Sequence, residues 1–331
     1  MTKRANIAFF VPHAGCPHSC SFCNQKQISG QMKPLKSEDI IKTLKGIKRE
    51  TLDNEKTELA FFGGSFTAIP KELMLKYLKT ANEFKDSGIF HGIRISTRPD
   101  CVSDETLSLL KEYGVTSIEL GAQSTDDNVL KANGRGHTAL EIEKASKRVK
   151  EHGFSLGLQM MTGLYKSTAE KDLKACTDII KLKPDTVRVY PTIVIKGTRL
   201  ESLYNSGEYT PETLDEAVDL CALMLPLFYE NNIKVIRLGL HSGGAVEEGY
   251  IAGPYHPSFG ELCESKLYLK TALIKLKDLP KGQYTVKVKQ SELSKMIGQK
   301  RINIEELKKY GYCCTVKGGS LARYEIEIEK M

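Results

Sequence analysis

The sequence predicts an α/β protein whose main part is a partial (β/α)6 barrel, and two observations support this fold class. Short β-branched or aromatic runs alternate with segments of helical periodicity through the first two thirds of the 331 residues, which is typical of repeated βα units on a parallel sheet. Six such units are too few for a closed eightfold barrel. We therefore expect an open barrel with its ligand site at the carboxyl ends of the strands.

The predicted elements follow one another in a regular order. Six strands are expected at residues 7–11, 59–62, 92–96, 117–120, 155–160 and 186–190, and the helices between them at 37–50, 71–84, 104–113, 139–152 and 169–181. A longer helix at 211–231 leads into a further strand at 233–238. The Gly- and Pro-rich segment 241–257 is expected to form a lid or seam.

The chain is expected to divide into a barrel with its lid, residues 1–270, and a small basic α+β domain, residues 271–331. Short Lys-rich elements predict a βααββ order, with a strand at 284–288, helices at 291–296 and 304–310, and strands at 313–316 and 323–328.

Between those two helices, Ile297-Gly298 is followed by the basic pair Lys300-Arg301. This segment is similar to the loop with which KH domains hold a nucleic-acid backbone. Arg301 stands where the KH pattern has its second glycine, and a left-handed backbone would be costly there. The alternative is a small Lys-rich fold that does not contact RNA.

Composition indicates a globular protein of a reducing compartment. The 40% hydrophobic and 27% charged residues are ordinary for a globular chain, and no run approaches the roughly 20 apolar residues of a membrane span. The apolar run at 7–12 is too short for a signal-peptide core. Nine cysteines, an odd number, argue against a disulfide framework. We expect a cytoplasmic protein without a membrane partner, and its net charge of +7 favours a polyanion such as RNA without requiring one.

Three cysteines, Cys16, Cys20 and Cys23, lie in one loop directly after the first predicted strand. Three thiolates can hold a 4Fe–4S cluster and leave one iron without a protein ligand, which makes that iron a reaction site. The Cys20/Cys23 pair also suits a structural zinc ion completed by His18 or His13, or a dithiol redox pair. From the residues alone these alternatives stay open.

The spacing C-x3-C-x2-C, with Phe22 before the third cysteine, resembles the motif of the radical S-adenosylmethionine (SAM) superfamily. The resemblance implies that Cys16, Cys20 and Cys23 hold a 4Fe–4S cluster and that SAM chelates the open iron through its amino and carboxylate groups. It implies reductive cleavage of SAM to a 5′-deoxyadenosyl radical that abstracts hydrogen from a substrate. An electron donor such as flavodoxin or ferredoxin would then be a partner.

Residues that end the second and third strands match positions where this superfamily contacts SAM. Gly63 and Gly64 occupy the place of a Gly-Gly-acidic motif in which Ser65 replaces the acidic residue. We expect the glycine carbonyls to meet the methionine amino group, because glycine lets the backbone approach a ligand. Ser96 and Arg98 resemble the position where a hydroxyl or guanidinium group contacts SAM.

Residues that end the fourth and fifth strands are further candidates. Glu119 and Gln123 end the fourth strand, and a carboxylate there can accept hydrogen bonds from a ribose diol. An ion pair with a neighbouring Arg is the alternative for Glu119. Gln159 and Met161 resemble the segment that contacts ribose and adenine, although Met161 could equally be a core residue.

The segment 189–200, with 203–204, 207–209 and 135–138, resembles the Elongator-catalytic-subunit-like branch of the superfamily. The resemblance covers roughly residues 5–265 and implies tRNA as a partner, since the full-length enzyme of that branch works on the wobble uridine. That enzyme has a longer gap between its first two cysteines and an acetyltransferase domain. The approximately sixty residues after the barrel are too few for that domain, so we expect no acetyl-CoA chemistry in this polypeptide.

Candidate catalytic residues lie at the predicted mouth of the barrel. Tyr190 and Lys196 are placed at or just beyond the end of the sixth strand, where Lys196 could pair with a phosphate or carboxylate, or remain solvated. His137 and His241 are further candidates with Arg135, although a loop histidine is more often a local hydrogen-bonding residue.

Three hypotheses follow from the sequence. The first is a radical SAM enzyme that modifies tRNA, and the second is a radical SAM lyase or oxidase that acts on a small molecule such as a modified nucleobase. The third is a non-enzymatic iron–sulfur or zinc protein. Whether the enzyme is a transferase or a lyase, which hydrogen is abstracted, whether SAM is consumed, and the oligomeric state are left open.

Overall fold

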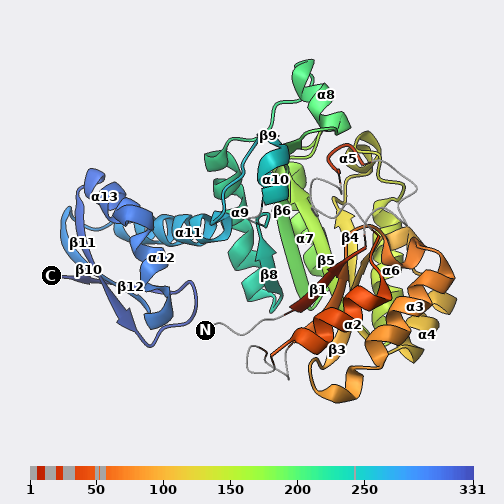
Figure 1. The fold of residues 1–331 in the computed structure, drawn as a ribbon. Coiled ribbons are helices and arrows are strands. Elements are labelled where there is room, and N and C mark those ends of the chain that lie inside the picture. The colour runs from red at the N-terminus through yellow and green to blue at the C-terminus, as the bar shows by residue number, and fades with distance from the viewer. Residues whose placement is uncertain (1–5, 12–19, 25–33, 49–51, 53–56, 242–243) are drawn as a thin grey trace.

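A computed structural model describes residues 6–11, 20–24, 34–48, 52, 57–241 and 244–331, and its main feature is a curled parallel sheet (Figure 1). Every neighbouring pair in the sheet is parallel. The strand order is β1 (Asn6–Phe10), β2 (Glu58–Phe62), β3 (Gly92–Thr97), β4 (Val115–Gln123), β5 (Ser155–Thr162), β6 (Thr186–Pro191) and β8 (Lys234–Leu238). The predicted partial barrel is confirmed, and the further strand joins it as the seventh.

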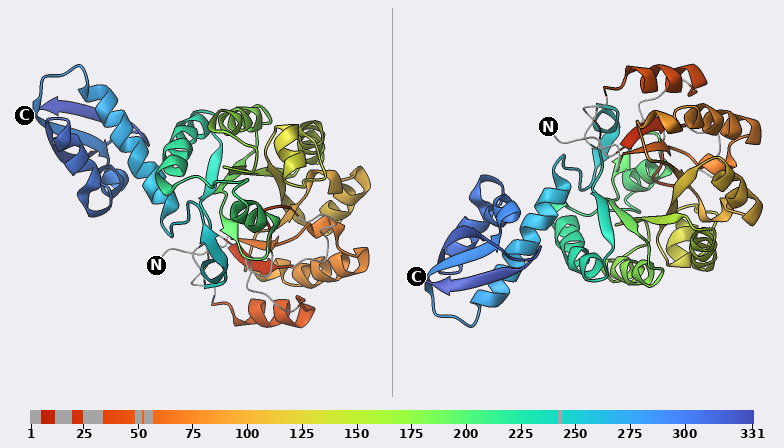
Figure 2. Two further views of the ribbon diagram at one scale, coloured as in Figure 1. Left: turned by 90° about the horizontal axis from the view of Figure 1, so that it is seen from above. Right: turned by 90° about the horizontal axis from the view of Figure 1, so that it is seen from below.

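Helices cover the outer face of this sheet (Figure 2). They are α2 (Ser37–Gly46), α3 (Lys71–Asn82), α4 (Asp104–Glu112), α6 (Ala139–Glu151), α7 (Ala169–Lys181) and α9 (Leu214–Glu230), close to the predicted ranges. Local sequence sets where several begin: Thr138 and Thr213 each cap a helix through a capping box. The main apolar core lies between these helices and the sheet.

The two faces of the sheet differ because successive strand residues point to opposite sides. Ile118 and Leu120 of β4 belong to the apolar core under the helices. Ser117 and Glu119, which alternate with them, contact polar residues of the neighbouring strands instead. The concave face of the barrel is therefore polar, and it is the face available to a ligand.

Several short elements gather at the carboxyl end of the barrel, and the sequence analysis did not predict them. They are α5 (Asp127–Ala132), β7 (Val194–Ile195), α8 (Arg199–Asn205), α10 (Gly244–Gly249) and β9 (Tyr250–Ala252). β7 and β9 pair antiparallel, so the expected lid segment 241–257 contributes α10 and one strand of a two-stranded sheet. Figure 1 shows α5, α8 and α10 together at this end.

Helix α11 (Phe259–Leu276) connects the barrel to the C-terminal sheet and was also missed. Phe259 and Cys263 are buried in the barrel core, whereas Tyr268 and Ala272 are buried in the core of the C-terminal domain. A helix buried against two cores has no single apolar stripe, which is the signal that sequence periodicity detects. The domain boundary expected after residue 270 falls inside this helix.

The C-terminal domain has the predicted βααββ order. It consists of β10 (Gly282–Lys289), α12 (Leu293–Ile297), α13 (Ile302–Lys309), β11 (Tyr312–Gly319) and β12 (Ile326–Lys330). β10 lies in the middle, parallel to β11 and antiparallel to β12. In the parts of the chain that the structure describes, no helix is sufficiently long and apolar to cross a membrane.

Candidate active site

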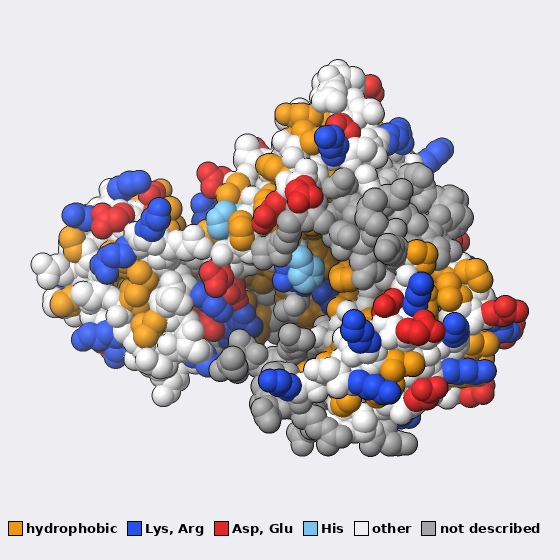
Figure 3. All heavy atoms as spheres, in the orientation of Figure 1, with side chains coloured by type: hydrophobic (Ala, Val, Ile, Leu, Met, Phe, Trp, Pro, Cys, Tyr) orange, Lys and Arg blue, Asp and Glu red, His pale blue; other side chains and the backbone are white. Residues whose placement is uncertain are grey.

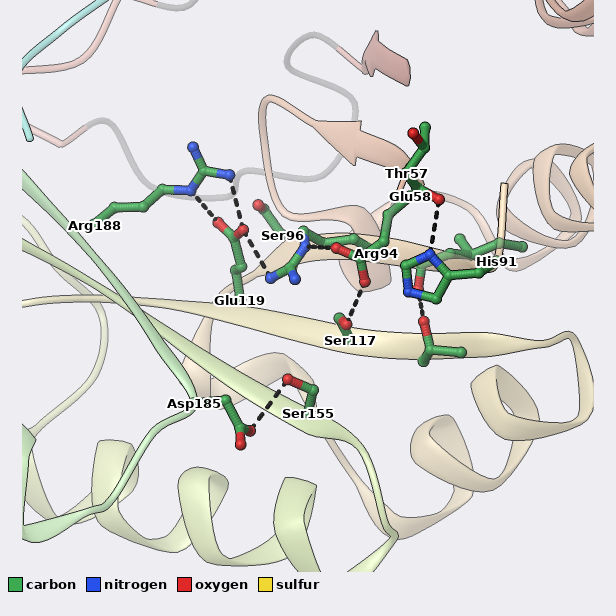
Figure 4. A network of polar contacts seen from close by, with 12 residues as sticks. Thr57, Glu58, His91, Arg94, Ser96, Ser117, Glu119, Ser155, Asp185 and Arg188 are labelled. Atoms are coloured by element: carbon green, nitrogen blue, oxygen red, sulfur yellow. Dashed lines mark hydrogen bonds and ion pairs between the residues drawn. The ribbon is translucent and has the colours of Figure 1, made fainter. Parts of the chain in front are cut away.

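A network of buried charges occupies the concave face of the barrel (Figure 4). Glu119 of β4 is 1% exposed. Its carboxylate accepts two hydrogen bonds from the Arg188 guanidinium of β6, at 2.8 Å from Nε and 2.9 Å from the second nitrogen. Arg94 of β3 donates to it at 3.1 Å and Gln159 of β5 at 2.8 Å. One carboxylate therefore connects four neighbouring strands.

The network continues toward β2. Arg94 also donates from Nε to Glu58 at 2.6 Å, and the Ser117 hydroxyl donates to the other Glu58 oxygen at 2.6 Å. Burial alone would lower the pKa of the Arg188 guanidinium, but the adjacent Glu119 carboxylate raises it above its usual value. Arg188 thus stays charged, and removing one partner of such a buried pair would be strongly destabilising.

These contacts occupy the hydrogen-bonding capacity of the Glu119 carboxylate. A carboxylate offers about four acceptor positions, and four protein donors from Arg188, Arg94 and Gln159 occupy those of Glu119. The ion pair left open as the alternative for Glu119 is present. A ribose contact by Glu119 stays a prediction, and one of these donors would have to move to allow it.

A second group of residues makes the open side of the concave face positive. Arg237 of β8 pairs in register with Arg188, and its guanidinium donates to the carbonyls of Gly239 and Leu240. Burial raises the pKa of the Tyr190 hydroxyl. Partial burial, with the guanidiniums of Arg237 and Arg188, lowers the pKa of His241 to about 4. Tyr190 and His241 therefore face cations as neutral groups near pH 7, and Figure 3 shows basic and histidine side chains in a central hollow.

The cysteine loop is anchored where it is described, at residues 20–24; Cys16 lies outside the described residues. The Ser21 hydroxyl donates to Asn133 at 2.6 Å, and the Asn24 side chain donates to the Lys196 carbonyl at 2.9 Å. Cys20 and Cys23 are both partly exposed. The loop is thus held between the end of α5 and the segment that follows β7.

Arg135 brings a positive charge to the cysteine loop. Its guanidinium donates to Cys20 Sγ at 3.1 Å and to the Gly121 carbonyl at 2.6 Å. A Cβ at Gly121 would lie 3.3 Å from that guanidinium, so the glycine leaves room for it. Arg135 is thus in direct contact with a predicted cluster ligand.

The residues present fit a cluster with SAM beside it. Two partly exposed cysteines of one loop lie at the carboxyl end of the barrel, and the Arg135 guanidinium contacts one of them, Cys20. Two buried polar atoms there, Gln123 Oε1 and Arg135 Nε, have no hydrogen-bond partner among the described residues. Buried polar atoms are normally paired, and a polar ligand at this end could pair with them. Gly63, with φ +93°, has space only for a hydrogen, because a Cβ would lie 3.0 Å from the Val11 carbonyl oxygen.

The other predicted SAM contacts divide into two groups. Ser96, which accepts from Gln159 at 3.4 Å, lies on the concave face, and Met161 packs beside Phe22 and Tyr190. Ser65 instead is 1% exposed and bonds the Thr97 hydroxyl at 2.8 Å. The roles of Ser96 and Met161 toward SAM stay predictions, whereas the Ser65 side chain is occupied in holding two strand ends together.

Three more candidates are either bonded to neighbouring protein groups or exposed to solvent. The Arg98 guanidinium forms two hydrogen bonds to Asp100, at 2.9 and 2.6 Å. His137 is 6% exposed, with Nε2 3.3 Å from the Ala122 carbonyl, and burial lowers its pKa to about 4. Lys196 is exposed. The structure thus contains the local alternatives expected for His137 and Lys196, and their catalytic roles are untested.

Sequence reasoning missed Arg94, Glu58 and Arg237 as parts of the site. The arginines leave a signal in the sequence, because each lies within an otherwise largely apolar strand, as in Ile93-Arg94-Ile95. A charge at such a place is buried and needs a partner.

Comparison with known proteins gives two family matches. The Radical SAM superfamily model matches residues 10–178, and the Radical_SAM C-terminal domain model matches residues 184–269. Human Elongator complex protein 3 is 31% identical over 193 residues, which are 52% of this chain and 35% of the human protein. The tRNA uridine(34) acetyltransferase of Methanocaldococcus infernus is 27% identical over 256 residues, covering 65% of this chain and 48% of that protein. The chain thus spans about half or less of these relatives' lengths.

Solved structures support the fold. The archaeal Methanocaldococcus infernus Elp3 with an N-terminal deletion has a TM-score of 0.65 at 23% identity, covering 82% of this chain and 64% of that one. Streptococcus suis SuiB bound to S-adenosylmethionine has a TM-score of 0.52 at 16% identity, covering 75% and 55%. Residues 10–178 are more than half of the 331-residue chain and include all three cysteines of the loop. The chain therefore belongs to the radical SAM superfamily, whose enzymes use a 4Fe–4S cluster and SAM.

Proposed function

We propose that this radical SAM enzyme modifies tRNA, with Cys16, Cys20 and Cys23 as the cluster ligands. The observation that carries the proposal is the similarity to the tRNA uridine(34) acetyltransferase of M. infernus, which extends over 256 residues. A similarity of this length involves most of the barrel and not only the cysteine motif. An electron donor such as flavodoxin or ferredoxin belongs to the same proposal.

The proposal assigns distinct tasks to residues of this chain. When bound, the cluster and SAM supply a 5′-deoxyadenosyl radical that takes a hydrogen atom from the substrate. Gly63 and Gly64 present backbone carbonyls to the SAM amino group. The Glu119 network keeps β3 to β6 at fixed spacing, so that the groups around SAM are already oriented before it binds.

Charge on the concave face supports an anionic substrate. Arg94, Arg188 and Arg237 are opposed there by the two carboxylates of Glu58 and Glu119. The excess positive charge lies at Arg237, toward the opening of the barrel. A phosphate-bearing substrate would be attracted to that side, and tRNA is such a substrate.

The test compares substrates in the anaerobically reconstituted protein. Bulk tRNA should increase 5′-deoxyadenosine formation, and mass spectrometry of the digested tRNA should show a new or altered nucleoside. Stimulation by a small-molecule extract containing modified nucleobases, with no effect of tRNA, would contradict the proposal and favour a lyase or oxidase acting on such a molecule. Heat-inactivated protein and protein without SAM are the controls.

A further inference from the structure

The C-terminal domain carries nearly all of the chain's excess charge. Residues 271–331 contain 13 Lys and Arg against 7 Asp and Glu, a net +6 of the whole chain's +7. Figure 3 shows Lys and Arg side chains spread over the visible face of this domain. Both family matches end by residue 269, so neither assigns a role to this charge.

Part of the charge is presented on a rigid, strained loop. Lys300 and Arg301, between α12 and α13, are exposed and have positive φ angles of 49° and 65°. The cost that the sequence analysis anticipated for Arg301 is therefore present. Backbone strain of this kind persists only where the surroundings enforce it.

The surroundings that enforce the loop can be identified. The buried Asn303 amide donates to the carbonyl and hydroxyl oxygens of Ser265 on α11, at 2.9 and 3.0 Å, and to the Met296 carbonyl of α12 at 3.0 Å. At Gly298 a Cβ would lie 2.8 Å from the Ile302 side chain. The loop is thus fastened to α11 while its cationic side chains point into solvent.

A cleft of about 540 Å³ lies where the edge strand β8 and the start of α11 meet Arg323 and Tyr324 of the C-terminal domain. Tyr229 of α9, 44% exposed, and Tyr324 line it with their rings in edge-to-face contact at 5.4 Å. Lys234 supplies positive charge to the same cleft, and Arg323 lines it while paired with Glu264. An accessible aromatic ring beside cations is the arrangement on which proteins stack nucleobases.

The cleft and the loop are linked through α11 and α12, since Lys295 of α12 contacts Glu264 of the cleft and lies three residues before Gly298 of the loop. Glu264, which lines the cleft, pairs with Arg323 and, at 2.7 Å, with Lys295 of α12. The next residue, Ser265, accepts the Asn303 hydrogen bonds that hold the loop. Lys295 also pairs with Glu292 at 2.8 Å, so Arg323 and Lys295 balance two carboxylates. The positive charge of the surface therefore comes from Lys234, Lys300 and Arg301, beside an aromatic ring and a cavity of nucleotide size.

We propose that this surface docks a single-stranded segment of RNA, with an unstacked base against Tyr229 in the cleft and the phosphodiester backbone at Lys300 and Arg301. The proposal rests on tRNA as the substrate class and adds a docking site outside the barrel. Charge complementarity favours a polynucleotide, and the exposed ring adds stacking that a merely polyanionic partner would not use.

The test measures binding of bulk tRNA to the full chain by fluorescence anisotropy from about 0.05 to 0.2 M salt. The double variant Lys300→Gln with Arg301→Gln should bind about tenfold more weakly, and the slope of log K against log salt should be shallower by about 1.4, since each single-strand phosphate contact contributes about 0.7. The matched control, Lys308→Gln with Lys309→Gln, removes the same charge at the far end of α13 and should bind like the wild type.

The cleft is tested by a conservative pair. Tyr229→Ala should weaken binding about fivefold or more, because it removes a stacking surface, whereas Tyr229→Phe should bind like the wild type. Equal affinity of all variants, or equal losses in the loop variant and its control, would overturn the docking surface. If the wild type modifies tRNA and the variants bind tRNA as well as the wild type, only the docking site is refuted. If the variants weaken binding but tRNA does not stimulate turnover, only the proposed function is refuted.

Discussion

The Glu119 carboxylate should be a structural centre of the barrel, and Glu119→Gln tests this. The substitution keeps the shape but leaves the buried Arg94 and Arg188 without their shared anion, and only one side-chain oxygen remains to accept four former hydrogen bonds. Removing one partner of a buried ion pair costs about 3–5 kcal/mol. For a chain of this size we expect a fall of roughly 4–7 °C in Tm.

The assay is thermal unfolding followed by circular dichroism in the metal-free protein. Glu105→Gln is the matched control, because Glu105 pairs with Lys71 at 3.2 Å and both side chains are mostly exposed. Solvent screens that pair, so its loss should barely change Tm. An unchanged Tm in Glu119→Gln, combined with lost SAM binding, would refute the structural role and favour the ribose contact.

Three further predictions concern the cluster, a partly buried acid and the glycine turn. Arg135→Gln should shift the cluster midpoint potential to a more negative value in an EPR-monitored titration, because a cation beside Cys20 stabilises the reduced form. The potential of Arg135→Lys should lie between those of the wild type and Arg135→Gln. An unchanged potential in both variants would contradict this role of Arg135. Burial raises the pKa of the Glu212 carboxyl to about 7, above its unfolded value of about 4.3. The contribution of this group to stability is therefore present below pH ~4.3 and is lost as the pH rises through ~7. Glu212→Gln should raise Tm more at pH 8 than at pH 4.5, and an equal rise at both pH values would count against this prediction. Gly63→Ala should destabilise by about 1–2 kcal/mol in chemical unfolding, since φ is +93° and the new Cβ would meet a backbone oxygen; wild-type stability would show that the turn can relax.

Most of the barrel was predictable because its strands are local patterns. Runs such as 92–96 contain β-branched residues bounded by turns, and they recur with helical segments between them. β7 and β9 have only two and three residues and exist through pairing with each other across more than fifty positions. Such pairing has no local signature, and α11 was missed because two cores share its buried surface.

The candidate site was predictable only in its sequence motif. The cysteine spacing indicated the cluster loop, but the contact between Arg135 and Cys20 joins residues 115 positions apart. Spacing likewise could not decide between a ribose contact and an ion pair for Glu119, because the deciding partners, Arg94 and Arg188, lie on other strands. The structure supplied those partners.

The most direct test of the central claim is the amount of 5′-deoxyadenosine released when the anaerobically reconstituted protein is reduced in the presence of SAM. Wild-type protein should contain about four irons per chain and release 5′-deoxyadenosine. Cys313→Ser, which changes an exposed cysteine far from the loop, should do the same, whereas Cys20→Ser should lose both iron and product. Release that is unaffected by Cys20→Ser, or a wild-type protein that binds zinc and no iron, would contradict the assignment of Cys16, Cys20 and Cys23 as the ligands of the radical-generating cluster.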